Sequence, residues 1–467
     1  MKKLDQPLEF NVQQKIDLIN SGKLPTGVVA RKETPDILSR TELALVAEAV
    51  LDDSYINWPN KMNNSSPGPI VTGYDFVNSK PISGINFASQ DYMSMCTHPG
   101  NIKATIEAVK ASGTHSGGSP LFFGKTPYYL AVIQSLKDAF KKVYPDPHAS
   151  IFSAGWMAGF GVISSLAYKS DHIVIDELCH NCLQFGAKAS GATLHKIPHL
   201  DNDAYCEKIA ELREKYPQTG IMAVTEGLFS MDSDSPDLVR IQQWAKKHNA
   251  LLVVDCAHDM FGVGEKGLGI AGDRLTEWDN VVLLGSGSKS LSNNFGWCVS
   301  NKSSLPKYLN YYSGSLTFSN ALAPGVAASV KHNIDLLMSK EGDERRIRSR
   351  RNVHYVRKRL TDAGFEIIGD PSPIVIVLIG SEFVSRSIAN MVYEEGIILN
   401  SVEYPACAQG DARLRLQIQC DHTIEQLDAL VDALLKVQPK VDEYLENDNF
   451  VKVVSASIMK SQEQQKL

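Results

Sequence analysis

Near its middle the chain runs Leu251-Leu252-Val253-Val254-Asp255-Cys256-Ala257-His258, four apolar residues followed by a carboxylate and then by an imidazole. A short unbroken apolar run predicts a strand that is buried on both faces, as in a parallel sheet. In open parallel sheets, ligands bind beyond the carboxyl ends of the strands. Asp255 and His258 are therefore candidate functional residues.

Two further runs have the same form. Val281-Val282-Leu283-Leu284 is followed by Gly285-Ser286-Gly287-Ser288-Lys289, which places hydroxyls and a lysine at the end of the next strand. Residues 149–153 lead into Ala154-Gly155-Trp156-Met157, a small-residue turn before a helix whose N-terminus can bind phosphate. Each of these three runs alone is weak evidence for a functional site, because a carboxylate can cap a helix and a loop lysine is commonly solvated. The occurrence of all three in this order along the chain indicates an active site.

Strands and helices alternate outward from these runs. We expect strands at residues 149–153, 172–175, 221–225, 251–255 and 280–284. Strands separated by helices imply right-handed crossovers, so the fold class is α/β, with a mostly parallel central sheet and helices on both faces. A charged helix at 341–363, strands at 374–379 and 413–419, and a helix at 424–435 predict a smaller C-terminal α+β domain.

The chain has 467 residues, of which 43% are hydrophobic. This length exceeds what a single hydrophobic core usually supports. We expect an N-terminal arm over residues 1–80, a large domain over 81–310, a small domain with its linking helix over 311–451, and a polar tail over 452–467. Within the arm, residues 41–51 have helical patterning and residues 63–69 have the composition of a linker. The sequence assigns the arm no role.

Composition points to a small-molecule substrate in a reducing compartment. The net charge of −6 gives no general attraction to nucleic acid. The eight cysteines form no disulfide framework, and we expect no signal peptide and no membrane span. The cytoplasm is the expected location.

Several motifs together resemble the α-oxoamine synthases, the family of fold-type I pyridoxal-phosphate (PLP) enzymes that includes 8-amino-7-oxononanoate synthase, glycine C-acetyltransferase and serine palmitoyltransferase. The resemblance runs from about residue 86 to residue 435. Its motifs are Ser89-Gln90-Asp91-Tyr92, Gly117-Gly118-Ser119, Glu226-Gly227-Leu228-Phe229-Ser230-Met231-Asp232, Asp255-Cys256-Ala257-His258, Ser286-Gly287-Ser288-Lys289 and Ala412-Arg413-Leu414-Arg415-Leu416.

The resemblance implies an aminotransferase-like fold and a PLP-dependent acyltransferase. Its reaction would be the decarboxylative Claisen condensation of a small amino acid with an acyl-CoA or other acyl-thioester, which yields an α-aminoketone, CoA and CO2. A homodimer with shared active sites is implied as well. The amino acid and the length of the acyl chain stay open.

By resemblance, four residues act on the cofactor ring. Lys289 corresponds to the lysine that carries PLP as a Schiff base and moves the Cα proton. Asp255 corresponds to the acid that pairs with the pyridine nitrogen, and His258 to the donor to the phenolic oxygen. His180 corresponds to the histidine that stacks on the ring.

The resemblance also implies the phosphate contacts. They would come from the turn at Gly155 and Trp156, from Ser286, and from Ser319 or Asn320 of the second copy in the dimer.

Further family positions concern the substrate and the edge of the ring. Ser230 and Glu226 correspond to residues near the ring oxygen, and Arg415 to the arginine that clamps the substrate carboxylate. Arg413 lies on the same face of the strand, so it remains an alternative clamp. Gln90 stands where the family commonly has an asparagine that helps bind the carboxylate.

Some features depart from the family or suggest other sites. Cys256 and Asp259 flank His258 where the family usually has glutamate and serine, which could alter specificity. A GxGxxG string at residues 262–267 follows its strand too late for a dinucleotide site, and the lysine loop lacks P-loop spacing. Cys179-x-x-Cys182 has no second ligand pair, so we expect no metal.

Two other functions remain open. An aminotransferase or aldolase-type lyase of the same fold would use the same lysine, aspartate and histidine but release a different product. A non-catalytic partner subunit of a heteromeric synthase is the second alternative, although such subunits tend to lose the lysine that this chain retains as Lys289.

Overall fold

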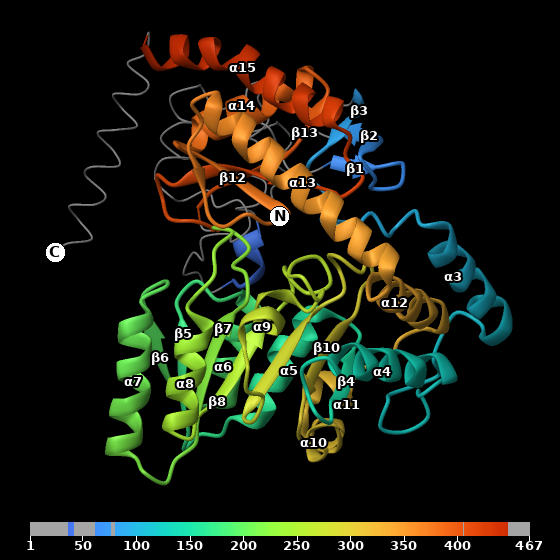
Figure 1. Ribbon diagram of the computed structural model, residues 1–467, viewed down its shortest axis with the longest axis vertical. Helices are drawn as coiled ribbons and strands as arrows, with labels where there is room; N and C mark the ends of the chain where they lie inside the picture. Colours follow the sequence, from blue (N-terminus) through green and yellow to red (C-terminus); the bar gives the residue numbers. More distant parts are fainter. Residues whose placement is uncertain (1–35, 42–60, 76–79, 405, 447–467) are drawn as a thin grey trace.

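A seven-stranded sheet forms the centre of the larger part of the molecule (Figure 1). This computed structural model describes residues 36–41, 61–75, 80–404 and 406–446. The strand order of the sheet is β4-β10-β9-β8-β7-β5-β6, and only β10 runs against its neighbours. The strands are β4 His148–Phe152, β5 His172–Asp176, β6 Thr193–Ile197, β7 Ile221–Glu226, β8 Leu251–Asp255, β9 Val281–Ser286 and β10 Gly296–Ser300.

Helices cover both faces of this sheet, and β8 shows why the sequence requires them. Leu252 and Val254 belong to one buried cluster, together with residues of α4, α7 and α8, whereas Val253 belongs to another, with residues of α5 and α6. Since successive side chains of a strand point to opposite faces, an apolar run must be covered twice. The predicted α/β class with a mostly parallel sheet is confirmed.

The helices of this part begin with α3 and end with α12. Their bounds are α3 Pro99–Ser112, α4 Pro127–Phe140, α5 Gly155–Leu166, α6 Asn181–Ser190, α7 Asn202–Lys215, α8 Leu238–Lys247, α9 Gly269–Arg274, α10 Ser304–Tyr312, α11 Gly314–Thr317 and α12 Pro324–Leu337.

Two strands of the sheet were not predicted. β6 is an edge strand, and exposed and half-buried residues such as Thr193, His195 and Lys196 give it no apolar run. β10 begins with Gly296, whose Cβ position would lie 2.3 Å from the backbone oxygen of Ala154, so a larger residue is excluded there. Both positions are set by tertiary context rather than by local preference.

The C-terminal part contains an antiparallel sheet of order β11-β12-β15-β14 with three helices against it. The predicted helices and strands all occur, and the terminal helix continues well beyond the predicted residue 435, past Pro439. The bounds are α13 Lys340–Asp362, β11 Ile367–Ile368, β12 Ile374–Gly380, α14 Glu382–Glu394, β13 Ile397–Ile398, β14 Asn400–Val402, β15 Ala412–Gln417 and α15 Ile424–Glu446.

A third sheet joins the first strands of the described chain to a strand of the C-terminal part. Strands β1 Lys61–Asn63, β2 Ile70–Asp75 and β3 Lys80–Asn86 are antiparallel, and β13 adds to β3 in parallel. Of the expected linker at 63–69, Asn63 belongs to β1, while residues 64–69 have no helix or strand and connect β1 to β2. A short 3-10 helix, η1, spans Leu38–Thr41.

Parts of the predicted organisation are not tested. The predicted helix at 41–51 lies, apart from Thr41, outside the described residues, as does the polar tail at 452–467. The domain boundaries at residues 80, 310 and 451 stay predictions.

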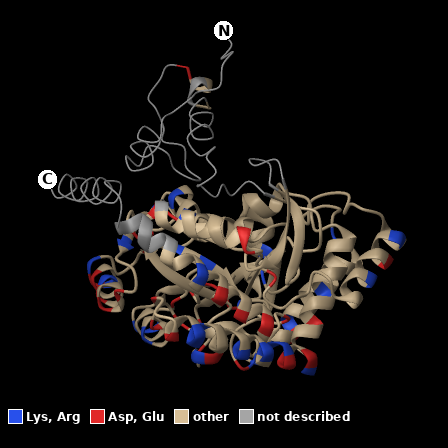
Figure 2. Cartoon of the chain, turned by 90° about the horizontal axis from the view of Figure 1, so that it is seen from above, with Lys and Arg blue, Asp and Glu red and all other residues tan. Residues whose placement is uncertain are grey.

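Acidic and basic residues both occur on the outer helices of the molecule, and neither kind covers one side alone (Figure 2). Within the ranges that the structure describes, no helix combines the length and apolar character that crossing a membrane requires.

Candidate active site

The carboxyl ends of β7, β8 and β9 bring the predicted acids together. Glu226 is paired with Asp255 in the register of β7 and β8, and Asp255 is paired with Leu284 of β9. Both carboxylates are buried, and Oδ1 of Asp255 accepts a hydrogen bond from the backbone N–H of Ala257 at 2.9 Å. The carboxyl ends of β7, β8 and β9 therefore lie side by side at one edge of the sheet.

Lys289 lies in the same buried environment. Burial lowers the pKa of Lys289, and the charge of Asp255 opposes this shift. Burial raises the pKa of Asp255 to about 6, while the N–H of Ala257 and the charge of Lys289 act against it. Burial and the nearby Asp255 raise the pKa of Glu226 well above its ordinary value. These shifts mark a functional site, because they combine desolvation with specific charged partners.

His258 contacts Tyr92, a residue to which the sequence assigned no role. The hydroxyl of Tyr92 lies 3.1 Å from Nδ1 of His258, and both side chains are buried. Burial, together with the positive charges of Lys289 and Arg415, lowers the pKa of His258 well below its ordinary value. Burial raises the pKa of Tyr92 to about 12. A neutral imidazole and a protonated phenol therefore face each other.

His180 stands at the start of α6 and caps that helix. Its backbone N–H donates to Oε1 of Glu226 at 2.5 Å, which ties the loop after β5 to the end of β7. Its Nδ1 accepts the backbone N–H of Cys182 at 3.3 Å. Burial and the charge of Lys289 lower the pKa of His180. The predicted stacking histidine is thus beside the predicted lysine.

The start of α5 and the end of β9 form a close contact. A Cβ at Gly155 would lie 2.3 Å from Cβ of Ser286, so only glycine allows this approach. Ser286 Oγ accepts the N–H of Ser288 at 3.1 Å. Trp156 is 44% exposed and stacks on Phe160 with ring centroids 5.2 Å apart. A helix N-terminus beside a hydroxyl group is suited to binding a phosphate group.

Ser319 and Asn320 lie in the loop between α11 and α12. Ser319 Oγ is 4.0 Å from Sδ of Met157, near the start of α5 in the same chain, and Asn320 is exposed. Their expected contribution to a second copy is not tested by one chain.

The two arginines of β15 differ in their partners. Arg413 is paired with Asp232 at 2.5 Å and donates to the backbone oxygen of Met231 at 3.0 Å. Arg415 donates from Nε to the backbone oxygen of Ser230 at 2.8 Å, whereas its Nη2 is buried and has no hydrogen-bond partner in the described part of the chain. A buried guanidinium nitrogen without a partner is costly unless a ligand accepts from it.

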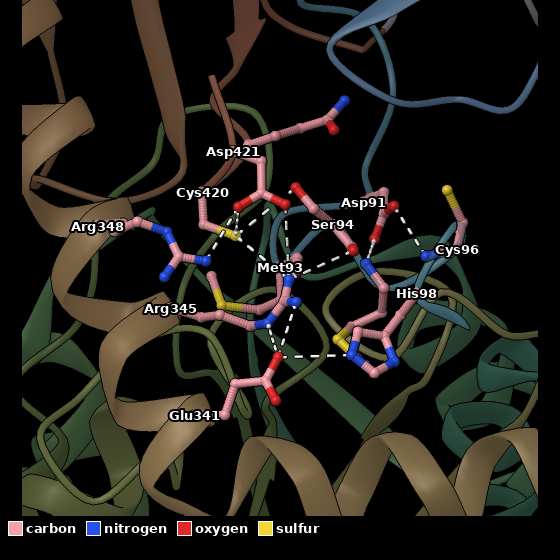
Figure 3. A network of polar contacts seen from close by, with 12 residues as sticks. Asp91, Met93, Ser94, Cys96, His98, Glu341, Arg345, Arg348, Cys420 and Asp421 are labelled. Carbon is pink, nitrogen blue, oxygen red and sulfur yellow. Dashed lines mark hydrogen bonds and ion pairs between the residues drawn. The ribbon is translucent and has the colours of Figure 1, made fainter. Parts of the chain in front are cut away.

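Gln90 precedes Tyr92 by two residues, in a segment that several polar contacts hold in place (Figure 3). Asp91 accepts the backbone N–H groups of Met95 at 2.8 Å and Cys96 at 3.1 Å. From α13, the buried Arg345 donates to the backbone oxygen of Met93 at 2.8 Å. The loop that carries Gln90 and Tyr92 is therefore fixed to α13.

Asp259 and Cys256, which depart from the family pattern, are both buried. Oδ2 of Asp259 accepts the N–H of Ile270 at 2.7 Å, while Oδ1 has no hydrogen-bond partner within the described ranges. Burial raises the pKa of Asp259 to about 7. The acid is packed beneath Gly227, whose Cβ position would lie 2.5 Å from Oδ2.

The residues present fit pyridoxal phosphate. The buried carboxylate of Asp255 could pair with the pyridine nitrogen, and Lys289, with its lowered pKa, could form a Schiff base with the aldehyde. The close contact of Gly155 with Ser286 leaves a helix N-terminus and a hydroxyl that could bind the phosphate. Across the described ranges, no group of three or more His, Cys, Asp or Glu residues could hold a metal ion.

Known proteins resemble this chain over most of its length. The family described as aminotransferase class I and II matches residues 82–434. An 8-amino-7-oxononanoate synthase from Trichlorobacter lovleyi is 31% identical over 352 residues, which are 75% of this chain and 88% of that protein. One from Methylococcus capsulatus is 32% identical over 357 residues, 76% of this chain and 89% of that protein.

A solved structure is similar as well. Serine palmitoyltransferase from S. paucimobilis, with PLP and myriocin bound, has a TM-score of 0.80 and 25% identity, and the match covers 87% of this chain and 99% of that one. The chain therefore belongs to the α-oxoamine synthases of the class I and II aminotransferase family, and it is a PLP-dependent acyltransferase that condenses an amino acid with an acyl-thioester and releases CO2.

Proposed function

We propose that the substrates are a small amino acid and an acyl-CoA, and that Arg415 binds the carboxylate of the amino acid. The unpartnered, buried Nη2 of Arg415 carries this proposal, because a carboxylate would supply the missing acceptor. Arg413, the alternative clamp, already has the carboxylate of Asp232 as its partner. Gln90 and the backbone near Ser230 complete the substrate side of the site.

When bound, PLP supplies an electron sink that stabilises negative charge at Cα. The chain's own residues would do the rest. Lys289 holds the cofactor and, as a neutral amine favoured by its lowered pKa, moves the Cα proton. Asp255 keeps a proton on the pyridine nitrogen. His258 binds the phenolic oxygen, and His180 covers the ring and excludes water from that face.

The remaining predicted residues would hold the edges of the cofactor. Gly155, Trp156 and Ser286 bind the phosphate through the start of α5 and the end of β9, which their close approach supports. Ser230 and Glu226 lie at the phenolic edge, at the end of β7.

We further propose a homodimer in which Ser319 or Asn320 of one copy completes the phosphate site of the other. Three large side chains, Phe122, Phe123 and Phe318, are 81%, 86% and 89% exposed. The loops that carry them are adjacent, because Ser119 Oγ donates to the backbone oxygen of Thr317 at 2.7 Å. Exposed aromatic residues that cluster in this way are typical of protein interfaces.

A cytoplasmic location is proposed from the cysteines. All eight are free, and six of them are buried, namely Cys179, Cys182, Cys206, Cys256, Cys298 and Cys420. Free thiols in such number are typical of a reducing compartment.

A product assay tests the proposed reaction. The purified protein with PLP is incubated with glycine, alanine, serine or 2-aminobutyrate and with acyl-CoAs of increasing chain length. Stoichiometric release of free CoA and CO2 with one amino acid is expected. A keto acid or an aldehyde formed without CoA release would instead indicate an aminotransferase or a lyase, and no product with any pair would favour a non-catalytic subunit.

A further inference from the structure

Two hydrogen-bond donors point at the same ring nitrogen of His180. The backbone N–H of Cys182 donates to Nδ1 at 3.3 Å, and Sγ of Cys182 lies 3.0 Å from the same atom. A backbone N–H is always a donor, so Nδ1 must accept and cannot itself carry a proton. A neutral imidazole in this position has its proton on Nε2.

The sulfur of Cys182 is held in place by the packing of α5 on α6. A Cβ at Gly159 of α5 would lie only 2.5 Å from that sulfur, so the absence of a side chain there makes room for the thiol. Burial raises the pKa of Cys182 well above its ordinary value, which keeps the thiol protonated and able to donate. The contact to His180 is therefore a fixed part of the structure.

The groups around His180 keep its ring neutral. Lys289 lies beside it after β9, His258 and Asp255 belong to the β8 end, and Glu226 at the end of β7 binds its backbone N–H. Burial and the positive charge of Lys289 together lower the pKa of His180. A neutral ring has a single proton to place, so the partner of Nδ1 decides which nitrogen can donate.

We propose that Cys182 is a positioning residue that fixes His180 in the Nε2–H tautomer, so that His180 serves as a hydrogen-bond donor at Nε2 and not as a base there. The inference deepens the proposed function, since it rests on the placement of His180 in the cofactor site. A donor at Nε2 suits an oxygen of the bound substrate, either carboxylate or carbonyl. It excludes proton abstraction by Nε2, which leaves that task to Lys289.

Solid-state NMR of the holoenzyme tests the tautomer directly. The protein is labelled with histidine that carries ¹⁵N at Nδ1 alone, and the His180→Gln variant identifies the signal of His180. An unprotonated Nδ1 is expected in the unmodified protein near neutral pH. A protonated Nδ1 would overturn the proposal, and this result needs neither turnover nor any variant of Cys182.

The contribution of the thiol is measured by titrating the same signal. Cys182→Ala removes one donor to Nδ1, so the midpoint of the pH titration of His180 should rise by about one pH unit. Cys182→Ser keeps a donor, so its titration midpoint should stay near that of the unmodified protein. An unchanged midpoint in Cys182→Ala would show that the thiol does not hold the ring. Cys179→Ala is the matched control, because it removes a buried thiol that donates to the backbone oxygen of Val224 at 3.7 Å, and it should leave the midpoint unchanged.

Steady-state kinetics adds a second measurement. Cys182→Ala should lower kcat about tenfold with little change in the KM for the amino acid, and Cys182→Ser should restore most of the loss. An equal loss in Cys179→Ala would mean that packing alone matters. If the unmodified protein bound no PLP, the proposed function would fail, while the protonation of Nδ1 could still be read.

Discussion

The hydroxyl of Tyr92 lies 3.1 Å from Nδ1 of His258, and Arg415 lies beside the same hydroxyl. One phenol thus links the loop before α3, the end of β8 and strand β15. Because Tyr92 stays protonated up to high pH and His258 stays neutral, the hydroxyl can donate to Nδ1. The proton of the imidazole is then on Nε2.

Replacing Tyr92 with Phe should destabilise the protein. The buried Nδ1 of His258 would lose its partner, which costs about 1–3 kcal/mol in the free energy of unfolding. Urea denaturation without PLP measures this loss, so that cofactor binding does not contribute. Tyr168→Phe is the control, because that side chain is exposed. Equal stability of the two variants would show that the contact contributes nothing.

Replacing Lys289 with Ala should abolish turnover and the visible absorption of covalently bound PLP. Lys289 is a half-buried amine near Asp255, and its lowered pKa favours the neutral, nucleophilic form of the amine. Absorption spectra and CoA release are recorded on the same samples. Lys266→Ala, at an exposed lysine, should behave like the unmodified protein. Turnover that survives in Lys289→Ala would contradict the assignment.

The two arginines of β15 should respond differently to substitution. Arg415→Gln should raise the KM for the amino acid about 10- to 100-fold while PLP absorption stays unchanged, since a charge-assisted hydrogen bond contributes about 1.5–3 kcal/mol. Arg413→Gln should instead lower stability, because Asp232 loses its ionic partner. Initial rates measure the KM of both variants for the amino acid, and thermal unfolding measures their stability. If Arg413→Gln had the larger effect on KM, the roles would be reversed.

Gly155→Ala should weaken PLP binding at least tenfold. The added Cβ would lie 2.3 Å from Cβ and 2.9 Å from Cα of Ser286, so the start of α5 would have to move away from β9. Fluorescence titration with PLP measures the affinity. Gly68→Ala provides the control, since nothing lies within 4 Å of its Cβ position. Unchanged affinity in Gly155→Ala would mean that the phosphate binds elsewhere.

His199 should make stability depend on pH in the alkaline range. It lies 3.0 Å from Asp176 and 3.2 Å from Asp234, and these two carboxylates outweigh burial and raise its pKa from 6.5 to about 10. A raised pKa in the folded state means that the stabilisation is complete below about pH 6.5 and is lost as pH rises towards 10. Urea denaturation from pH 6 to 10 should show this decline, and His199→Gln should flatten it. Parallel curves for the two proteins would refute the prediction.

The sequence predicted most of the central sheet because β5, β7, β8 and β9 are buried on both faces and therefore read as apolar runs. It did not predict β6, whose place at the edge leaves Thr193 and Lys196 exposed. Of the residues that the resemblance named, Glu226, Asp255 and Ser286 are the last residues of β7, β8 and β9. Their contacts could not be predicted, because Tyr92 and His258 are 166 positions apart in the chain.

The choice between Arg413 and Arg415 also needed the structure. The two residues share one face of β15, so alternation along the strand cannot separate them. What distinguishes them is Asp232, from a loop 181 positions away, whose carboxylate forms an ion pair with Arg413. Partners at such separations follow from the packing of whole elements and leave no local pattern.

The parallel pairing of β3 with β13 has a consequence for synthesis of the protein. Strand β3 is synthesised long before Ile397 and Ile398, the residues of β13 that pair with it. At ordinary translation rates the wait is on the order of tens of seconds. During that time the N–H of Ile85, which later donates to the backbone oxygen of Gly396, has no partner strand, so the nascent chain presents an open edge there. An unpaired strand edge of this kind can pair with another extended segment until β13 is made.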